Sequence, residues 1–143
     1  MRRNVLASLA AICLVAACAA QTEWAPLAPF TAARVSDKSV VIRVDETEYD
    51  LVSINDVSTA DLLGYCRKAY QNWWEKRFTE DLVEVLAGVG HPMAPDKTVK
   101  LVVREIPGGR SVTMARAPMT TKNRVAAYLF RQKLVDAHPE MPR

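Results

Sequence analysis

Apolar and polar residues alternate in two separate parts of this 143-residue chain, and each part predicts a β-hairpin. In the first part, β-branched residues at 40–44 and a second alternating run at 49–54 flank a polar turn. In the second part, the runs 97–105 and 111–115 flank Pro107-Gly108-Gly109, which is typical of a hairpin turn. Hairpins pair their strands antiparallel, so the pattern predicts an antiparallel sheet of about four strands.

A helical period of apolar residues fills the interval between the hairpins, from about residue 59 to residue 88. Ser58 precedes it as a predicted N-cap, and Asp61 places a negative charge in the first turn, where it favours the helix dipole. The apolar faces of the two halves point in different directions, so one straight helix against one surface cannot bury both. We favour a break near residues 77–79, with Thr79 as a second N-cap, over one long helix that serves two surfaces.

A last helix is predicted over residues 121–137, with Thr120 or Thr121 as its N-cap. Its predicted apolar face consists of Val125, Ala126, Leu129, Phe130 and Leu134. The elements follow the order ββ-α(α)-ββ-α. We therefore predict a two-layer α+β domain, in which two or three helices pack on one face of the sheet.

The first 17 residues have the organisation of an export signal. Arg2 and Arg3 precede an apolar run from Val5 to Ala17, and small residues follow. The run is too short to cross a bilayer, because a spanning helix takes about 20 apolar residues. The sequence therefore predicts an exported protein that loses these residues as a signal peptide.

Val15-Ala16-Ala17-Cys18 lies at the end of the apolar run and resembles the lipobox of bacterial lipoproteins. The resemblance implies that Cys18 becomes the first mature residue and carries acyl chains, which anchor a protein durably when two or three are present. Ala19 behind the cysteine is similar to outer-membrane lipoproteins of enteric bacteria, which implies the outer membrane, facing the periplasm, in preference to the inner membrane. An ordinary signal peptidase could instead cut after Ala19 or Ala20 and leave a soluble periplasmic or secreted protein.

These patterns divide the chain into four parts, and the length and composition suit one folded domain. Residues 1–17 are the predicted signal peptide. Residues 18–34 contain two prolines and several alanines and are predicted to form the lipidated N-terminus and a tether. Residues 35–138 form the single α+β domain, and residues 139–143 form a C-terminal tail.

Charge is close to balanced in the mature chain but is unevenly distributed. Without Arg2 and Arg3, 17 basic residues face 16 acidic ones, so the net charge falls from +3 to +1. Seven acidic residues lie within 37–61 and seven basic residues within 104–133, and we expect these segments to lie near each other and compensate. The alternative is a basic patch that attracts an anionic lipid headgroup or glycan phosphate. Nucleic-acid binding is not predicted, because no concentrated basic face is evident.

Candidate catalytic groups are few. Cys66 could act as a nucleophile with His91 or His138 as its base, but its position on an apolar helix face favours core packing. The carboxylates of Glu75, Glu80, Asp81 and Glu84 could serve as acid–base or metal groups. No histidine stands three or four residues away to complete a metal pair, so solvated helix positions are favoured, and neither metal nor cofactor is predicted.

Two pairs of residues are candidates for a partner or ligand surface. Trp73 and Trp74 could stack against a glycan or peptide, although neighbours on a helix point about 100° apart and core packing is favoured. Arg124 and Arg131 are seven residues apart, share one side of the last helix and could bind anions, with ordinary solvation as the alternative.

No motif in the chain assigns a reaction, which favours a protein that is not an enzyme. We therefore expect a small lipid-anchored cell-envelope protein that acts as a binding or scaffolding module, with a protein or polymer of the envelope as its partner. The alternatives are an exported enzyme or enzyme subdomain that uses Cys66 or Glu80 with Glu84, and a freely secreted binding domain.

Overall fold

A computed structural model describes residues 24–143, which fold into an α+β domain with an antiparallel sheet. The strands are β1 (Ala32–Val35), β2 (Val40–Val44), β3 (Thr47–Ile54), β4 (Val57–Ser58), β5 (Thr98–Glu105) and β6 (Ser111–Pro118). The helices are α1 (Thr59–Tyr70), the 3-10 turn η1 (Gln71–Trp73), α2 (Trp74–Glu80), α3 (Leu82–Gly88) and α4 (Thr121–Ala137). The strand order is β1-β2-β3-β5-β6, and β4 pairs with β3.

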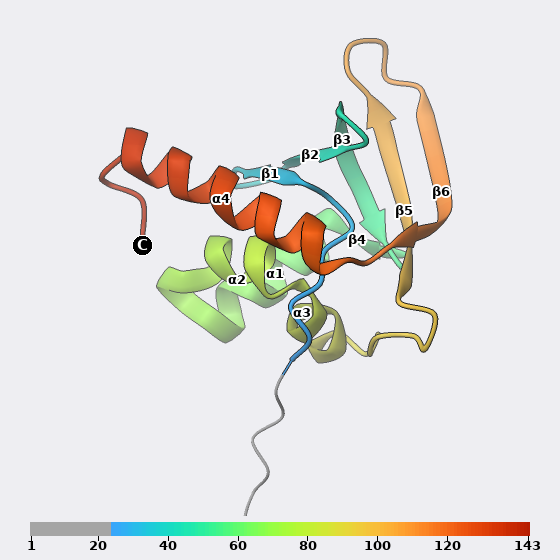
Figure 1. Cartoon of the computed structure of the whole chain (residues 1–143), viewed down its shortest axis with the longest axis horizontal. Coiled ribbons are helices and arrows are strands. Elements are labelled where there is room, and N and C mark those ends of the chain that lie inside the picture. Colours follow the sequence, from blue (N-terminus) through green and yellow to red (C-terminus); the bar gives the residue numbers. More distant parts are fainter. Residues whose placement is uncertain (1–23) are drawn as a thin grey trace, which may run out of the picture.

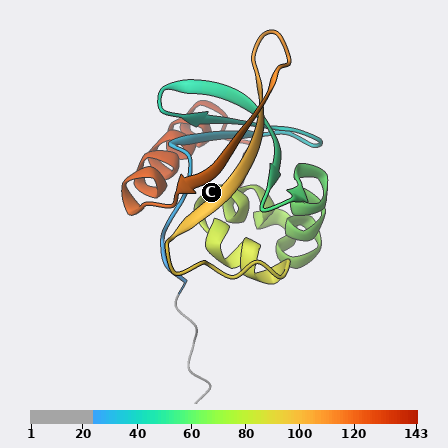
Figure 2. The same cartoon turned by 90° about the vertical axis from the view of Figure 1, so that its right-hand side faces the viewer.

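Both predicted hairpins are present. In the β2–β3 hairpin, Val44 is paired with Thr47, and the two turn residues Asp45 and Glu46 have φ angles of 46° and 65°. Positive φ at both central residues gives the turn a twist that matches that of the flanking strands. The β5–β6 hairpin projects from the body of the domain, at the end opposite to the first described residues (Figures 1 and 2).

The sheet has more strands than the four predicted, because β1 and β4 were not expected. Ala32 and Ala33 in β1 carry no strand signal of their own, and β1 forms because it pairs with β2. The preceding residues Leu27, Ala28 and Phe30 are buried, and the backbones of Ala28 and Thr120 exchange two hydrogen bonds. Residues 27–34 therefore belong to the domain, and their prediction as tether is wrong.

The helical interval breaks at two places, neither of which is Thr79. Ser58 caps α1 as predicted, since its hydroxyl oxygen accepts from the Asp61 amide at 3.1 Å. The first break follows α1, where Gln71 has a φ of 50° and the chain forms η1. The second lies at Asp81, between α2 and α3, with φ of −124° and ψ of 39°. Thr79 is buried inside α2, so its prediction as an N-cap is wrong.

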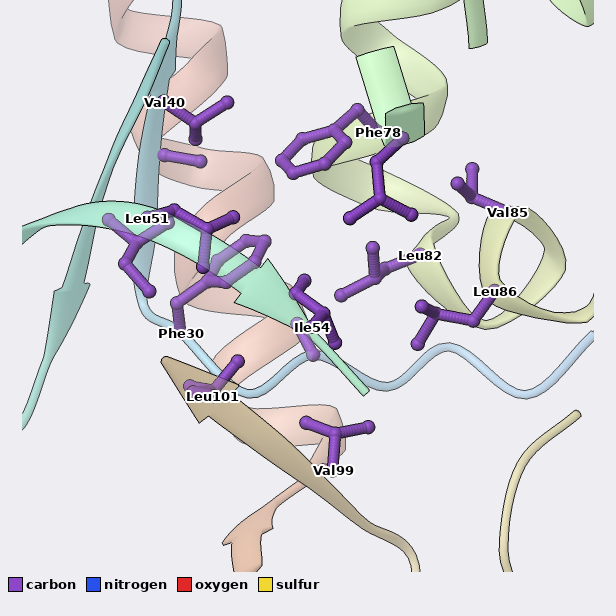
Figure 3. Close-up of a cluster of buried hydrophobic side chains, with 14 of the residues drawn as sticks. Phe30, Val40, Leu51, Ile54, Phe78, Leu82, Val85, Leu86, Val99 and Leu101 are labelled. Carbon is purple, nitrogen blue, oxygen red and sulfur yellow. The ribbon is translucent and has the colours of Figure 1, made fainter. Parts of the chain in front are cut away.

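The hydrophobic core lies between the sheet and helices α1 to α3. Figure 3 shows side chains of α2 and α3, among them Phe78 and Leu82, directed toward those of the strands and of the N-terminal segment. The rings of Phe78 and Phe30 are nearly parallel, with centroids 6.4 Å apart. Residues from the whole described chain thus contribute to one core, which agrees with a single domain.

Helix α4 begins as predicted but buries a different face. The Thr120 hydroxyl caps it by accepting from the Asn123 amide at 3.0 Å. Val125 and Leu129, which the sequence places on the buried face, are 47% and 53% exposed. The buried residues are Ala127, Arg131 and Val135, one turn apart along the side that contacts β1 and α2. The predicted apolar face of this helix is therefore wrong.

The ladder between β3 and β5 joins the two hairpins across the whole helical interval. Its register pairs Ile54 with Leu101, 47 positions further along the chain. At this point the Asn55 amide donates to the Lys100 carbonyl, and the Asn55 side-chain oxygen accepts from the Lys100 amide, both at 2.9 Å. The start and the end of the helical interval are thus fixed against each other.

Candidate functional site

The contact between α2 and α4 brings together a buried acidic side chain and two arginines. Glu80 is the last residue of α2 and is 3% exposed, while Arg131 on α4 is 2% exposed. Arg124 lies seven residues before Arg131, which is about two helical turns, so both side chains face α2. We call Glu80, Arg124, Arg131 and the neighbouring Lys76 the Glu80 cluster.

Three cations surround the Glu80 carboxylate. One carboxylate oxygen lies 3.7 Å from Nη1 of Arg131, and the other lies 3.6 Å from Nη2 of Arg124 and 4.0 Å from Nζ of Lys76. Arg124 also donates from Nε to the Glu80 carbonyl at 3.0 Å. Burial raises the pKa of the Glu80 carboxyl above its ordinary value, although Lys76 and the two arginines act to lower it.

Hydrogen bonding in the Glu80 cluster is incomplete. Among the described residues, Oε1 of Glu80 and both Nε and Nη1 of Arg131 have no hydrogen-bond partner. Nη2 of Arg131 donates to the backbone carbonyl of Pro142 in the C-terminal tail. An arginine remains charged when it is buried, so each unmet N–H group is costly and calls for an acceptor.

A cavity of about 190 Å³ lies beside this arginine. Its walls come from β1, α2, α4 and the tail. The lining residues are Ala33, Arg34, Val35, Glu75, Thr79, Arg131, Leu134 and Met141. Burial also raises the pKa of the carboxyl of Glu75, which lines the same cavity. The arrangement combines a buried cation with apolar walls, and it can hold a small molecule that has one acidic group.

Sequence reasoning identified Arg124 and Arg131 as candidates but assigned them to a solvated surface, and it also placed Glu80 in solvent. The available signal was the seven-residue spacing of the two arginines, which puts both on one side of a helix. What the sequence did not indicate is that this side faces α2 and meets Glu80 there.

Cys66 lies in the core, as its position on the apolar face of α1 predicts. It is fully buried, and burial raises the pKa of its thiol to about 12. Within residues 24–143 no hydrogen bond joins it to His91 or His138; the latter lies 3.3 Å from Glu140 in the tail. These features argue against a thiol nucleophile.

We expect Cys66 to resist alkylation in the native protein. A buried thiol with a raised pKa supplies almost no thiolate near pH 8, and the thiolate is the reactive form. Iodoacetamide treatment followed by mass spectrometry of the peptide that carries Cys66 measures this, with urea-unfolded protein as the control that reacts. Equal alkylation of native and unfolded protein would contradict the buried position.

The predicted pair of Glu80 and Glu84 does not form a joint site. The break at Asp81 places Glu80 in α2 and Glu84 in α3. Arg77 binds both Asp81 and Glu84, with nitrogen–oxygen distances of 3.0 and 3.4 Å. Within residues 24–143 no three His, Cys, Asp or Glu side chains are grouped so that they could hold a metal ion.

The two tryptophans have different surroundings and do not share a stacking surface. Trp73 in η1 is 51% exposed. Trp74 packs against the core, and the guanidinium of Arg67 lies 4.2 Å from the centre of its ring. Neither tryptophan belongs to the Glu80 cluster, so the four predicted surface residues do not form one site.

The acidic and basic segments meet where β3 pairs with β5, at Asp50 and Arg104, and several of their other charges are paired with other parts of the chain. Arg34 and Arg43 both bind Glu48, and Arg116 binds Asp96. The predicted proximity of the two segments is therefore confirmed, but in the described part of the chain no ion pair joins 37–61 to 104–133.

Cys18 and the signal-like residues before it lie outside the described residues. From Trp24 onward, no helix is both long enough and apolar enough to cross a membrane. In comparisons with known proteins, no family model, no curated protein and no solved structure matches this chain.

Proposed function

We propose that this protein is a small lipid-anchored component of a bacterial cell envelope, and that its domain binds or scaffolds another envelope component. The observation that carries the proposal is Val15-Ala16-Ala17-Cys18 directly behind a charged and then apolar N-terminus. Acyl chains on Cys18 would concentrate the domain at the periplasmic face of the outer membrane.

The position of the domain relative to its anchor supports a role close to the membrane. Leu27 is buried in the domain, and it lies only nine positions after Cys18. Nine extended residues span at most about 30 Å, so the domain would remain that close to the lipid. The first described residues and the β5–β6 hairpin lie at opposite ends of the domain, so the hairpin would point away from the membrane (Figure 1).

The enzyme alternative receives less support. Its thiol version requires a reactive Cys66, which is buried and has a raised pKa. Its carboxylate version requires Glu80 and Glu84 to act together, but they lie on separate helices, and Glu84 is paired with Arg77. A cavity with a buried arginine suits binding better than it suits either reaction.

Metabolic labelling with an alkyne fatty acid tests the anchor. We expect the wild-type protein to carry the label and to partition into the detergent phase. The variant Cys18→Ser should lose the label, whereas Cys13→Ser, which changes the other cysteine of the leader, should keep it. A correctly processed but unlabelled wild-type protein, or a mature mass that begins at Ala20 or Gln21, would refute the anchor and favour the freely secreted form.

A further inference from the structure

We propose that the cavity beside Arg131 binds a carboxylate attached to a short apolar group, and that the C-terminal tail covers this site until the ligand displaces it. The inference deepens the proposed binding role and rests on it, because it names the chemical class that the domain recognises. The ligand site does not depend on the lipid anchor, and the experiment below does not involve the anchor. A negative result for the ligand site would therefore leave the proposed anchor unaffected, and the reverse also holds.

The first argument is the geometry of the Arg131 side chain. In a guanidinium group the N–H of Nε and one N–H of Nη2 lie on the same edge and suit a carboxylate, which accepts two parallel hydrogen bonds. Here Nη2 donates to the single carbonyl oxygen of Pro142, and Nε has no partner among the described residues. The tail therefore accepts only one of the two hydrogen bonds that this edge can donate, whereas a carboxylate could accept both.

The second argument is the pairing of charge around this edge. Glu80 is shared among Arg131, Arg124 and Lys76, and Arg124 also lies 3.9 Å from Asp81. Glu80 approaches Arg131 at Nη1, 3.7 Å away, and not along the edge formed by Nε and Nη2. Among the described residues this edge therefore has no carboxylate hydrogen-bond partner.

The third argument is the size and lining of the cavity. At about 190 Å³ it has the volume of roughly six water molecules at ~30 Å³ each, which suits a small organic molecule or one amino-acid side chain. Ala33, Val35 and Leu134 provide apolar walls. The aliphatic group of a ligand could be buried against these walls while its carboxylate binds the arginine. Inorganic anions would satisfy the arginine but not these walls.

The fourth argument is the position of the tail. Met141 lines the cavity, and the neighbouring Pro142 carbonyl binds Arg131, so the segment after α4 closes one side. The tail follows the end of α4 and contains no helix or strand. A segment held by few contacts opens at low cost, so a ligand that binds Arg131 more completely can displace it.

Titration of the intact protein with butyrate, followed through the Nε–H resonance of Arg131 in ¹⁵N spectra, tests the site. We expect a saturable shift with butyrate and none with butyramide, which has a similar shape but no charge. Arg131→Lys keeps the charge but loses the two-pronged edge, and should weaken binding about tenfold, the effect of one charged hydrogen bond. The control Arg116→Lys changes an arginine on β6 that is 74% exposed and paired with Asp96, away from the cavity, and should change affinity by less than about twofold.

Deletion of residues 141–143 separates binding from a merely structural role of Arg131, and it serves equally if Arg131→Lys fails to fold. Removal of a competing cover should tighten butyrate binding several-fold, whereas loss of a structural element would weaken it. A short peptide that ends in valine, compared with its C-terminal amide, shows whether the carboxylate belongs to a free acid or to a partner's C-terminus. Equal effects of butyrate and butyramide, or weaker binding after the deletion, would overturn the proposal.

Discussion

Replacement of Glu80 by leucine should lower the free energy of unfolding by about 3–5 kcal/mol, the cost of removing one member of a buried ion pair. The reason is that Arg131, 2% exposed, would keep its charge and lose the carboxylate that lies 3.7 Å away. Urea unfolding followed by circular dichroism measures the change. Glu84→Leu is the matched control, because Glu84 is also paired with an arginine but is only partly buried, and should cost about 1 kcal/mol or less.

The same cluster predicts strong coupling between Glu80 and Arg131. The double variant Glu80→Leu with Arg131→Met should regain most of the stability lost in Glu80→Leu, since two apolar side chains leave no unpaired charge. The raised pKa of Glu80 means that its protonated form is favoured on folding, so its contribution falls as the pH rises above 4.5. The stability of the double variant relative to the wild type, which alone retains Glu80, should therefore rise with pH. Additive single effects would contradict the proposed pairing.

Replacement of Phe78 by alanine should cost about 3–5 kcal/mol, the usual loss when a buried phenylalanine is truncated. Phe78 is fully buried and stacks on Phe30 from the N-terminal segment, so the variant leaves a cavity where α2 meets that segment. The measurement is again urea unfolding, with an unchanged dependence on denaturant as the sign of an intact native state.

Trp73→Ala provides the contrast for this prediction. Periodicity places Trp73 on the apolar face of the first helix, but the chain leaves α1 at Gln71, and Trp73 is 51% exposed in η1. Its removal should cost less than about 1 kcal/mol, as expected at a surface position. A loss as large as that of Phe78→Ala would mean that the helix continues through this region.

The features that the sequence predicted correctly are those that local chemistry determines. The alternation of valine and isoleucine at 40–44 is sufficient to define β2, and the caps Ser58 and Thr120 have hydroxyls that reach the amide three residues later. The strand β1 was missed because alanines have no preference for strands and the nearby prolines suggested a tether. Its formation depends on pairing with β2, which is a tertiary effect.

The candidate site was the hardest part to predict, because it contradicts the rule on which the helix faces were assigned. That rule places arginine and glutamate in solvent, so Arg131 and Glu80 were assigned to exposed faces and Leu129 to the core. In the structure each buried charge is tolerated because the other lies across the contact between α2 and α4. No pattern within one helix reveals a partner on another helix 51 residues away in the sequence.

The long-range ladder between β3 and β5 has a further consequence for how this molecule can fail. Each hairpin is a local structure that forms quickly. The β3–β5 ladder between the hairpins forms only after the intervening helical segment has brought its two ends close together. If the pairing between β3 and β5 were lost, both strands would present unpaired edges, which readily associate with other chains. The packing of helices α1 to α3 therefore holds the two hairpins together and protects their strand edges from association with other chains.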